Sequence, residues 1–295
     1  MKALCYDIGG TDIKYGIVED GKIIEKYSMK TNVHLGREDI ERRLVEAGKE
    51  LLSRHEVCGV GISCAGSIDC EHGKILIPGD KLKTTKGMNF TELFKKHFNL
   101  MVAADNDVNC FGQAESVAGA GITYDNFLMM TIGTGIGGAI IYDDKVMHGL
   151  NYNAGEFGRM IIGEETFENL ASTSALIERA KNAGLDVENG LDVYRYYDAK
   201  NETAIKVVNE FYHYLAIGIA NLVYIFNPQA VIIGGGISAR SDFGTEINAY
   251  ADYYLVDGFQ DTLDIIPAKF QNDGGILGAY CNFIDRYGKG NEKNE

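Results

Sequence analysis

One short unit occurs twice in this chain: an apolar strand, a glycine-rich turn, a second strand and an acidic turn. The first copy starts at residue 4, contains DIGGTDIKYGIVEDG and ends at Asp20-Gly21. The second starts near residue 128, where FLMMTIG and IGGAIIY are joined by Thr134-Gly135 and closed by Asp143-Asp144. Apolar runs bounded by glycine and aspartate are typical of buried strands. Two copies are too few for a solenoid, so the repeat predicts two domains of similar plan.

The rest of the chain predicts an α/β protein, because strand patterns alternate with helical spacing. Its 295 residues suit one large domain or two modest ones. We expect an N-terminal domain over 1–118, joined by a C-terminal helix at 275–288, and a C-terminal domain over 119–274. Strands are expected at 2–8, 12–18, 22–29, 57–63, 100–104, 127–133, 136–142 and 263–266 and in QAVIIG. Helices are expected at 37–54, 90–98, 106–119, 203–226, 242–256 and 275–287. The tail GKGNEKNE is expected to fray.

The charge balance argues against several classes of protein. The formal net charge is −14, and the only basic cluster is the short stretch with Lys81, Lys83 and Lys86, so we expect no binding to nucleic acid. No run approaches the ~18 apolar residues of a membrane span, and Asp7 leaves no room for a signal peptide. The six cysteines form no Cys-x-x-Cys pair and resemble reduced core residues. We therefore expect a cytoplasmic protein.

The first glycine-rich turn is a candidate phosphate site. Gly9 and Gly10 let backbone N–H groups approach a phosphate, Thr11 offers a hydroxyl, and Lys14 lies three residues further on. Asp7, at the strand end, can hold a hydrated Mg²⁺. A tight hairpin that needs glycine for positive φ explains the same residues equally well.

Two further glycine-rich strand ends strengthen that interpretation. Thr134 and Gly135 lie in TIGTGIGG, and Gly234, Gly235 and Gly236 follow a buried strand. Each alone is as compatible with a structural turn as with a ligand. Three such strand ends in one chain indicate a nucleotide bound between two domains.

The run Asp105-Asn106-Asp107 precedes a predicted helix. Asp105 or Asn106 can simply cap that helix, which is the commoner role for such residues. Three more polar groups in five residues exceed what a cap needs. The helix dipole favours an ionised Asp107, and such a carboxylate can accept a proton from a substrate hydroxyl.

Five motifs together resemble, in order and spacing, the ROK family of sugar kinases, and the resemblance covers essentially the whole chain. It implies an α/β, two-domain actin-like ATPase (ribonuclease H-like) fold with the active site in the interdomain cleft. The motifs are Asp7-x-Gly-Gly-Thr11, Asn106-Asp107-x-Asn109, Gly133-Thr-Gly135-x-Gly-Gly138, Gly155-Glu156-x-Gly158 and the glycine run that ends at Ser238.

The resemblance also implies roles for these residues. ATP phosphates bind at the first two glycine-rich turns, the third turn lies near the adenosine, and Mg²⁺ is held by Asp7 through water. Asp107 corresponds to the general base that takes the proton of the attacking sugar hydroxyl. Asn106, Glu156 and Glu168 correspond to sugar ligands. The family implies a homodimer or higher oligomer.

The chain departs from many ROK proteins after Glu156. Their histidine three residues later is replaced by Arg159, and no cysteine lies between Cys110 and Cys281, so we expect no structural zinc site in this chain. Glu156-Phe157-Gly158 resembles a zinc-less branch that includes β-glucoside kinases, which act on the 6-hydroxyl of the non-reducing sugar. Arg159 can face solvent or pair with a carboxylate such as Glu164 or Glu165, or it can line the sugar pocket as a substrate-binding residue.

The sequence therefore predicts an ATP- and Mg²⁺-dependent kinase for the 6-hydroxyl of a hexose or β-glucoside. Alternatives are a kinase for N-acetylmannosamine or another hexosamine, a broad glucokinase or fructokinase, and a non-catalytic sugar sensor. A ROK-type repressor carries a helix-turn-helix domain before the kinase-like part. The early phosphate motif and the acidic charge argue against it.

Overall fold

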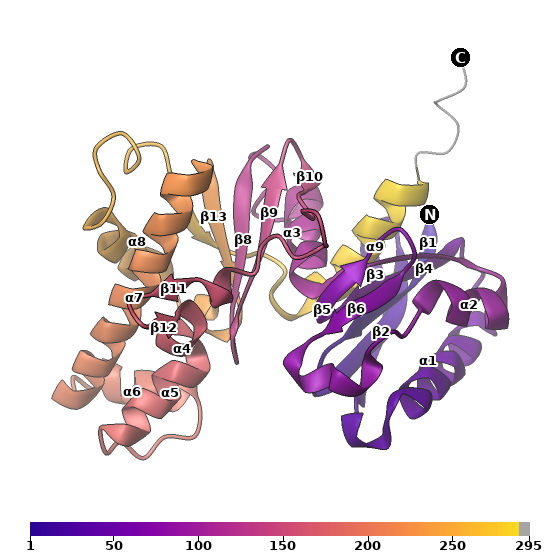
Figure 1. Ribbon diagram of the computed structural model, residues 1–295, viewed down its shortest axis with the longest axis horizontal. Helices are drawn as coiled ribbons and strands as arrows, with labels where there is room; N and C mark the ends of the chain where they lie inside the picture. The colour runs from indigo at the N-terminus through magenta and orange to yellow at the C-terminus, as the bar shows by residue number, and fades with distance from the viewer. Residues whose placement is uncertain (289–295) are drawn as a thin grey trace. The chain divides into compact units, whose positions relative to one another are not determined.

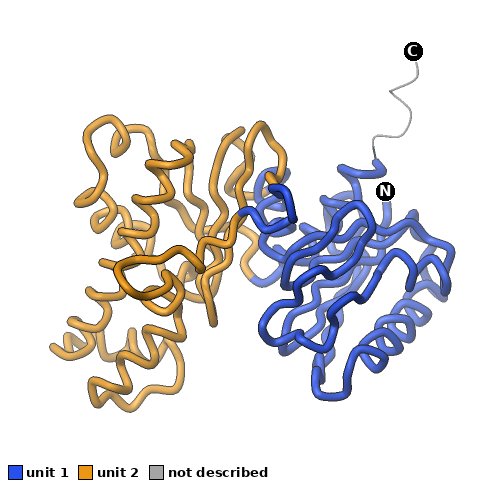
Figure 2. The backbone as a smooth tube through the Cα atoms, viewed as in Figure 1, with its two compact units in different colours: residues 1–118, 148–154, 272–295 blue, residues 119–147, 155–271 orange. Residues whose placement is uncertain are grey.

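The computed structural model describes residues 1–288 (Figure 1), and within it the chain forms two compact units (Figure 2). Unit 1 contains Met1–Ala118, His148–Ala154 and the described residues from Asn272 to Gly288. Unit 2 contains Gly119–Met147 and Gly155–Gln271. The segment 148–154, which the sequence analysis placed in the second domain, thus groups with the first sheet. The frayed tail expected at 288–295 falls outside the described residues except for Gly288.

Unit 1 is built on a five-stranded sheet of order β3-β2-β1-β4-β7. Strands β1 (Lys2–Ile8), β2 (Asp12–Glu19) and β3 (Lys22–Lys30) form an antiparallel meander, while β4 (Gly59–Cys64) and β7 (Met101–Asn106) run parallel to β1. A small hairpin of β5 (Gly66–Asp69) and β6 (Lys74–Pro78) follows β4. The helices of unit 1 are α1 (Arg37–Leu52), α2 (Phe90–Phe98), α3 (Asp107–Ala118) and α9 (Gly274–Tyr287).

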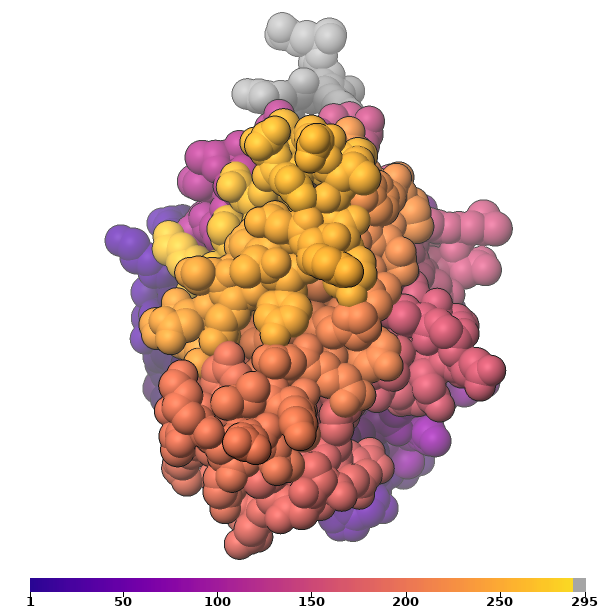
Figure 3. Space-filling view, turned by 90° about the vertical axis from the view of Figure 1, so that its left-hand side faces the viewer, coloured from indigo at the N-terminus to yellow at the C-terminus, as the bar shows by residue number. Residues whose placement is uncertain are grey.

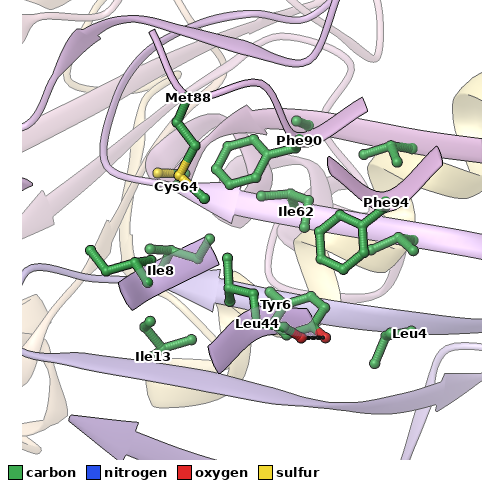
Figure 4. Packing of buried hydrophobic residues seen from close by; sticks show 14 of the residues in the cluster. Leu4, Tyr6, Ile8, Ile13, Leu44, Ile62, Cys64, Met88, Phe90 and Phe94 are labelled. Carbon is green, nitrogen blue, oxygen red and sulfur yellow. Dashed lines mark hydrogen bonds between the residues drawn. The ribbon is translucent and has the colours of Figure 1, made fainter. Parts of the chain in front are cut away.

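The core of unit 1 lies between this sheet and α1 and α2 (Figure 4). Tyr6 and Ile62 from the sheet pack with Phe90 and Phe94, and all four are fully buried. The Tyr6 hydroxyl donates a 2.8 Å hydrogen bond to the carbonyl oxygen of Leu44 on α1. A buried phenol needs such a partner, because an unpaired hydroxyl in an apolar core is costly.

Small residues let α9 pack closely on β4 and α3. A Cβ atom at Gly61 would lie 2.2 Å from the carbonyl oxygen of Ala279, and one at Gly278 would lie 1.9 Å from that of Cys110. Both distances are far below van der Waals contact. Glycine at these positions therefore allows the helix to approach the sheet, and it brings the start of α9 next to Asp7.

Unit 2 repeats the plan with a sheet of order β10-β9-β8-β13-β14. Strand β8 (Phe127–Ile132) pairs antiparallel with β9 (Ile136–Tyr142) and parallel with β13 (Ala230–Gly234), as β1 pairs with β2 and β4. The repeat in the sequence is thus a repeat in structure. The remaining strands are β10 (Lys145–Val146), β14 (Asp264–Pro267) and the short pair β11 (Ile161–Ile162) and β12 (Glu165–Thr166).

Helices form the other half of unit 2. They are α4 (Phe167–Ala171), α5 (Thr173–Asn182), α6 (Gly190–Asp198), α7 (Glu202–Phe226) and α8 (Phe243–Asp252). As its apolar sequence predicts, α7 is the central helix: it packs against α4, α5, α6 and α8 and buries residues around most of its circumference. Figure 3 shows a face of unit 2 on which residues of this helical half, pink to orange, and of the chain after α8, in gold, are exposed.

Most predicted elements form, with shifted ends. Asn106 is the last residue of β7, and the helix predicted from 106 begins at Asp107. The helix predicted over 242–256 ends at Asp252. The β5-β6 hairpin was not predicted, because its strands are short and their pairing contains a register shift.

Candidate active site

Three parallel strands of unit 1 place polar side chains side by side. In the register of the sheet, Asp7 on β1 lies opposite Ser63 on β4, which lies opposite Asp105 on β7. The carboxyl ends of parallel strands are the usual ligand-binding edge of α/β sheets. The Ser63 hydroxyl donates a 2.9 Å hydrogen bond to Asp7 Oδ1. No local sequence pattern marks Ser63 as a site residue, because its position beside Asp7 depends on the pairing of distant strands.

The first glycine-rich turn begins two residues after Asp7, at Gly9. Its closing bond runs from the Gly9 N–H to the Asp12 carbonyl oxygen at 3.1 Å. Neither Gly9 nor Gly10 has a positive φ, so the turn does not use glycine for left-handed backbone. A Cβ at Gly10 would instead lie 2.4 Å from Lys81 Cβ, and glycine is needed for that close approach. Thr11, next in the turn, is exposed.

Lys14 lies opposite Asp7 on β2 and is already engaged within unit 1. Its Nζ lies 3.4 Å from Asp7 Oδ2 and donates a 2.8 Å hydrogen bond to the Asn272 carbonyl oxygen. Gly275, in the first turn of α9, faces the same carboxylate, because a Cβ there would lie 2.4 Å from Asp7 Cγ. Asp7 is therefore held by a hydroxyl, an ammonium group and a tightly packed helix start.

Asn106 caps helix α3. Its Oδ1 accepts hydrogen bonds from the N–H groups of Val108 (2.8 Å) and Asn109 (3.1 Å), and its Nδ2 donates to the Gly66 carbonyl oxygen at 3.0 Å. These bonds use both lone pairs of the side-chain amide oxygen and one of the two N–H groups on Nδ2. The capping role considered for Asn106 is thus real, and it leaves one donor for a substrate oxygen.

Asp107 begins α3 and is half-buried. One of its oxygens, Oδ1, lies 3.1 Å from the Val108 N–H, and the positive end of the helix dipole favours its ionised form. Its neighbour Asp105 is only 2% exposed and faces inward. Two carboxylates two residues apart therefore differ in access: Asp105 belongs to the interior, and Asp107 is accessible to solvent.

In unit 2, the turn with Thr134 and Gly135 packs against Glu168. A Cβ at Gly135 would lie 2.5 Å from Glu168 Oε2, so glycine here keeps room for that carboxylate. The Gly133 carbonyl oxygen accepts a 2.9 Å hydrogen bond from Thr173 N–H, which ties the turn to the start of α5. Thr134 itself is exposed.

The third glycine run ends strand β13. Gly234 is buried as the last strand residue, and Gly235 has a φ of 100°, which disfavours other residues. A Cβ at Gly235 would also lie 2.2 Å from the Ile132 carbonyl oxygen, whereas one at Gly236 would meet no atom within 4 Å. Gly235 is thus structural, and Gly236 borders open space.

That open space is a cavity of about 390 Å³ within unit 2. Thr134 and Gly236 line one part of it, and Ile177, Tyr194 and Arg240 line another. The Arg240 guanidinium carbon lies 4.1 Å from the centre of the Tyr194 ring, and its Nη1 lies 3.2 Å from Asp198 Oδ2. The size and the mainly apolar lining suit a small organic ligand. Sequence reasoning found the two glycine-rich turns but missed the helical residues, which no motif marks.

Glu156 precedes a helical turn, Phe157–Arg159, that packs on β9. Gly155, with φ 91°, lies so close to Gly138 that a Cβ would be 2.5 Å from the Gly138 carbonyl oxygen. The glycines of both motifs therefore form one tight contact, which presents Glu156 at the surface. Arg159 pairs with a carboxylate, as one of the predicted alternatives has it: its Nη1 lies 3.2 Å from Glu168 Oε1.

Comparison with known proteins identifies the family. The sequence model of the ROK family matches residues 3–286. The chain belongs to the ROK family. A β-glucoside kinase of Listeria monocytogenes is 32% identical over 297 residues, covering 96% of this chain and 98% of the relative.

Two solved structures show the same fold over almost the whole chain. A Listeria monocytogenes protein proposed to be an N-acetylmannosamine kinase is 31% identical, with a TM-score of 0.86 and coverage of 97% and 99% of the two chains. A ROK family protein of Streptococcus pneumoniae in complex with sucrose is 27% identical, with the same TM-score and coverage. This ROK chain thus has the α/β fold of the actin-like ATPases, with two units that each combine a sheet and helices. None of its helices within 1–288 is both long and apolar enough to span a bilayer.

Proposed function

We propose that this ROK protein is a carbohydrate kinase that transfers the γ-phosphoryl group of ATP to a sugar hydroxyl. Its membership of the ROK family over residues 3–286 carries the proposal, and its β-glucoside kinase relative supports it. The edge of the first sheet adds a chemical reason, since Asp7 is the second-last residue of β1 and Asp107 directly follows β7. Phosphoryl transfer requires mainly positioning and neutralisation of charge, which suits an acidic protein with few basic side chains at the site.

Asp107 is the general base in this mechanism. Its carboxylate accepts the proton of the attacking hydroxyl as that oxygen forms a bond to the γ-phosphorus and the bond to the β-phosphate oxygen breaks. ADP leaves with the electrons of that bond. Asn106 offers its remaining N–H to a neighbouring sugar hydroxyl. Glu156 and Glu168 of unit 2 accept hydrogen bonds from further hydroxyls.

The phosphates of ATP are held by the turns at Gly9-Gly10-Thr11 and Thr134-Gly135. Asp7 suits a hydrated Mg²⁺, because this cation prefers carboxylate oxygens and retains several waters. Ser63 and Lys14 already contact its two oxygens, which favours contact through water. Bound there, Mg²⁺ would neutralise charge on the phosphates. Lys14 then acts mainly by orienting Asp7.

The nucleoside occupies the cavity of unit 2. Gly236 gives it backbone access, and Ile177 with Tyr194 provides an apolar wall. Arg240 is held over Tyr194 by Asp198, so its planar guanidinium can stack on a base.

For the acceptor, we propose the 6-hydroxyl of a hexose or β-glucoside. The β-glucoside kinase relative and the sucrose bound to the Streptococcus pneumoniae structure both favour a site that tolerates a substituent on the sugar. N-acetylmannosamine is the second candidate, on the strength of the other Listeria monocytogenes protein. We further propose that the protein works as a homodimer or higher oligomer in the cytoplasm, where its ATP is available.

The test is ADP release from Mg-ATP over a panel of glucose, mannose, N-acetylmannosamine, cellobiose and aryl β-glucosides. Replacing Asp107 by Asn should reduce kcat by about 10²–10⁴, the usual contribution of a positioned base, with little change in sugar KM. Asp261→Asn, an exposed aspartate of unit 2, is the matched control and should be silent. An unchanged kcat in Asp107→Asn would refute the assignment of Asp107 as the general base. A lack of turnover on every sugar by the wild-type protein would contradict the proposed kinase activity.

A further inference from the structure

A cluster of three potential metal ligands lies within unit 1, beside the proposed active site and outside the roles assigned so far. It consists of the Cys70 thiol, the Asp105 carboxylate and the His148 imidazole, whose ligand atoms all lie within 4.8 Å of one another. The three residues come from distant parts of the chain. Cys70 follows β5, Asp105 lies near the end of β7, and His148 opens the segment 148–154 that joins unit 1.

We propose that Cys70, Asp105 and His148 form a binding site for a transition-metal cation, with Zn²⁺ as the best match. One sulfur, one nitrogen and one oxygen suit a borderline-soft ion, whereas Mg²⁺ and Ca²⁺ prefer oxygen alone. Zinc bonds of about 2.0–2.3 Å separate the ligand atoms of a tetrahedron by about 3.3–3.8 Å. To reach that geometry, His148 Nε2 and Asp105 Oδ2, now 2.7 Å apart, must separate by less than about 1 Å, and Cys70 Sγ, which lies within 4.8 Å of both, must come to the same spacing.

The carboxylate is already oriented for this role. Asp105 Oδ1 accepts hydrogen bonds from the Asn106 N–H at 2.7 Å and from Asn109 Nδ2 at 2.9 Å. Its other oxygen, Oδ2, faces His148. Hydrogen bonds to the distal oxygen of a carboxylate fix its direction, as outer-shell partners do in metal sites. A cation at Oδ2 would leave both Oδ1 bonds intact.

The segment that carries His148 is held against the β5 region by further contacts. The Ser67 hydroxyl bonds to Asn153 Oδ1, and the Tyr152 side chain bonds to Asp69. The Ala154 N–H donates a 3.1 Å hydrogen bond to the His148 carbonyl oxygen, which closes the segment on itself. The imidazole is therefore placed next to Asp105 by five residues that take no part in the cluster.

Without a cation, hydrogen bonds connect the three side chains of the cluster. The Cys70 thiol is a hydrogen-bond partner of Asp105, and its Sγ also lies 3.4 Å from the Ile68 carbonyl oxygen. Burial, reinforced by the negative charge of Asp105, raises the pKa of Cys70 well above its usual range, so this thiol is no nucleophile at neutral pH. A metal ion replaces the thiol proton and the proton shared by His148 and Asp105, so its binding releases protons.

The site differs from the two metal positions already considered. Asp7 offers only carboxylate oxygens, and Cys70 precedes the region between Cys110 and Cys281 that lacks cysteines. Metal binding here would connect three segments of unit 1 next to Asn106, whose N–H bonds to Asp105. Its primary effect is on the stability of unit 1. It does not depend on the proposed kinase activity.

The experiment uses the full-length protein after dialysis against a chelator, with Zn²⁺ and Co²⁺ as probes. Calorimetry should give one Zn²⁺ per chain, with a binding heat that changes with the ionisation enthalpy of the buffer because protons are released. Co²⁺ should produce a thiolate charge-transfer band in the near ultraviolet. A ligand that binds only the folded state raises Tm, so excess Zn²⁺ should raise the Tm of the wild-type protein.

Cys70→Ser and His148→Asn should each weaken Zn²⁺ binding at least tenfold and abolish the Tm shift, and Cys70→Ser should remove the charge-transfer band. Asn109→Ala should weaken binding less. The controls are Cys58→Ser and His34→Asn, both at exposed positions of unit 1, which should bind as wild type. Absence of one-to-one binding in the wild type would overturn the site, and so would Zn²⁺ affinity that both ligand variants retain. Circular dichroism of each variant shows whether a loss reflects the site or the fold.

Discussion

Arg159 Nη1 lies 3.2 Å from Glu168 Oε1, so the residue that replaces the family's histidine is paired with a proposed sugar ligand. Glu168 in turn borders Gly135 of the phosphate turn, where a Cβ would lie 2.5 Å from Oε2. One carboxylate thus contacts both the arginine and the glycine-rich turn. Arg159 can influence the sugar by fixing the position of Glu168, without touching the sugar itself.

Removing this arginine should affect sugar binding more than stability. Arg159→Ala frees Glu168, and we expect the sugar KM to rise about 3- to 10-fold, which corresponds to about 0.7–1.4 kcal/mol. Arg159 is 59% exposed, and exposed ion pairs contribute little to stability, so Tm should change little. Arg195→Ala breaks an exposed pair with Asp192 on α6 and serves as the control. An unchanged KM across the sugar panel would show that Arg159 has no part in the site.

A substitution at the start of α9 should also impair the reaction. Gly275→Ala places a methyl group 2.4 Å from Asp7 Cγ, and the carboxylate or the helix must move. We expect kcat/KM to fall at least tenfold, because small displacements of a positioned group are costly in catalysis. Gly244→Ala is the matched control: it also lies second in a helix, but its Cβ would meet only Pro267 Cδ, at 3.9 Å. There alanine should be neutral or slightly stabilising. Equal activity in the two variants would refute a tight fit at Asp7.

Helix α1 allows a prediction about pH. Hydrogen bonds from Arg42 and Arg43 hold the pKa of Asp39 below its ordinary value. A carboxylate whose pKa is lower in the folded state stabilises the protein above its unfolded pKa, about 3.9, and this contribution is lost as pH falls through the folded pKa. Asp39→Asn should therefore lower Tm at pH 7, and the difference from wild type should shrink below about pH 4. Glu38→Gln, an exposed neighbour in the same turn, is the control. A difference that persists at low pH would contradict the ion pairs as its source.

Local patterns predicted much of this architecture. The two glycine-rich turns predicted the hairpins β1-β2 and β8-β9. The run Asp105-Asn106-Asp107 predicted the junction of β7 and α3. Spacing could not predict which distant strands pair, so Ser63 beside Asp7 was missed. The pairing of Arg159 with Glu168 depends on how Phe157–Arg159 packs near α4, which spacing along the sequence does not predict.

The cluster at Asp105 shows the same limit more sharply. Cys70 and His148 stand 78 positions apart in the sequence, and neither belongs to a motif. They meet because β5 and the segment 148–154 both contact the end of β7. Only the fold reveals such a set, since its members share no periodicity and no spacing.

The cavity of unit 2 provides a test that separates nucleotide from sugar. Ser174 lines it from α5 and is exposed, so Ser174→Trp adds an indole to the cavity with little effect on the core. If the cavity holds the nucleoside, KM for ATP should rise at least tenfold, while sugar binding in the absence of nucleotide stays unchanged. Glu178→Trp, one turn further along α5, is also exposed but does not line the cavity, so it should keep the wild-type KM. Initial rates at varied ATP and saturating sugar measure the difference. A rise in sugar KM alone would place the acceptor, and not the nucleotide, in this cavity.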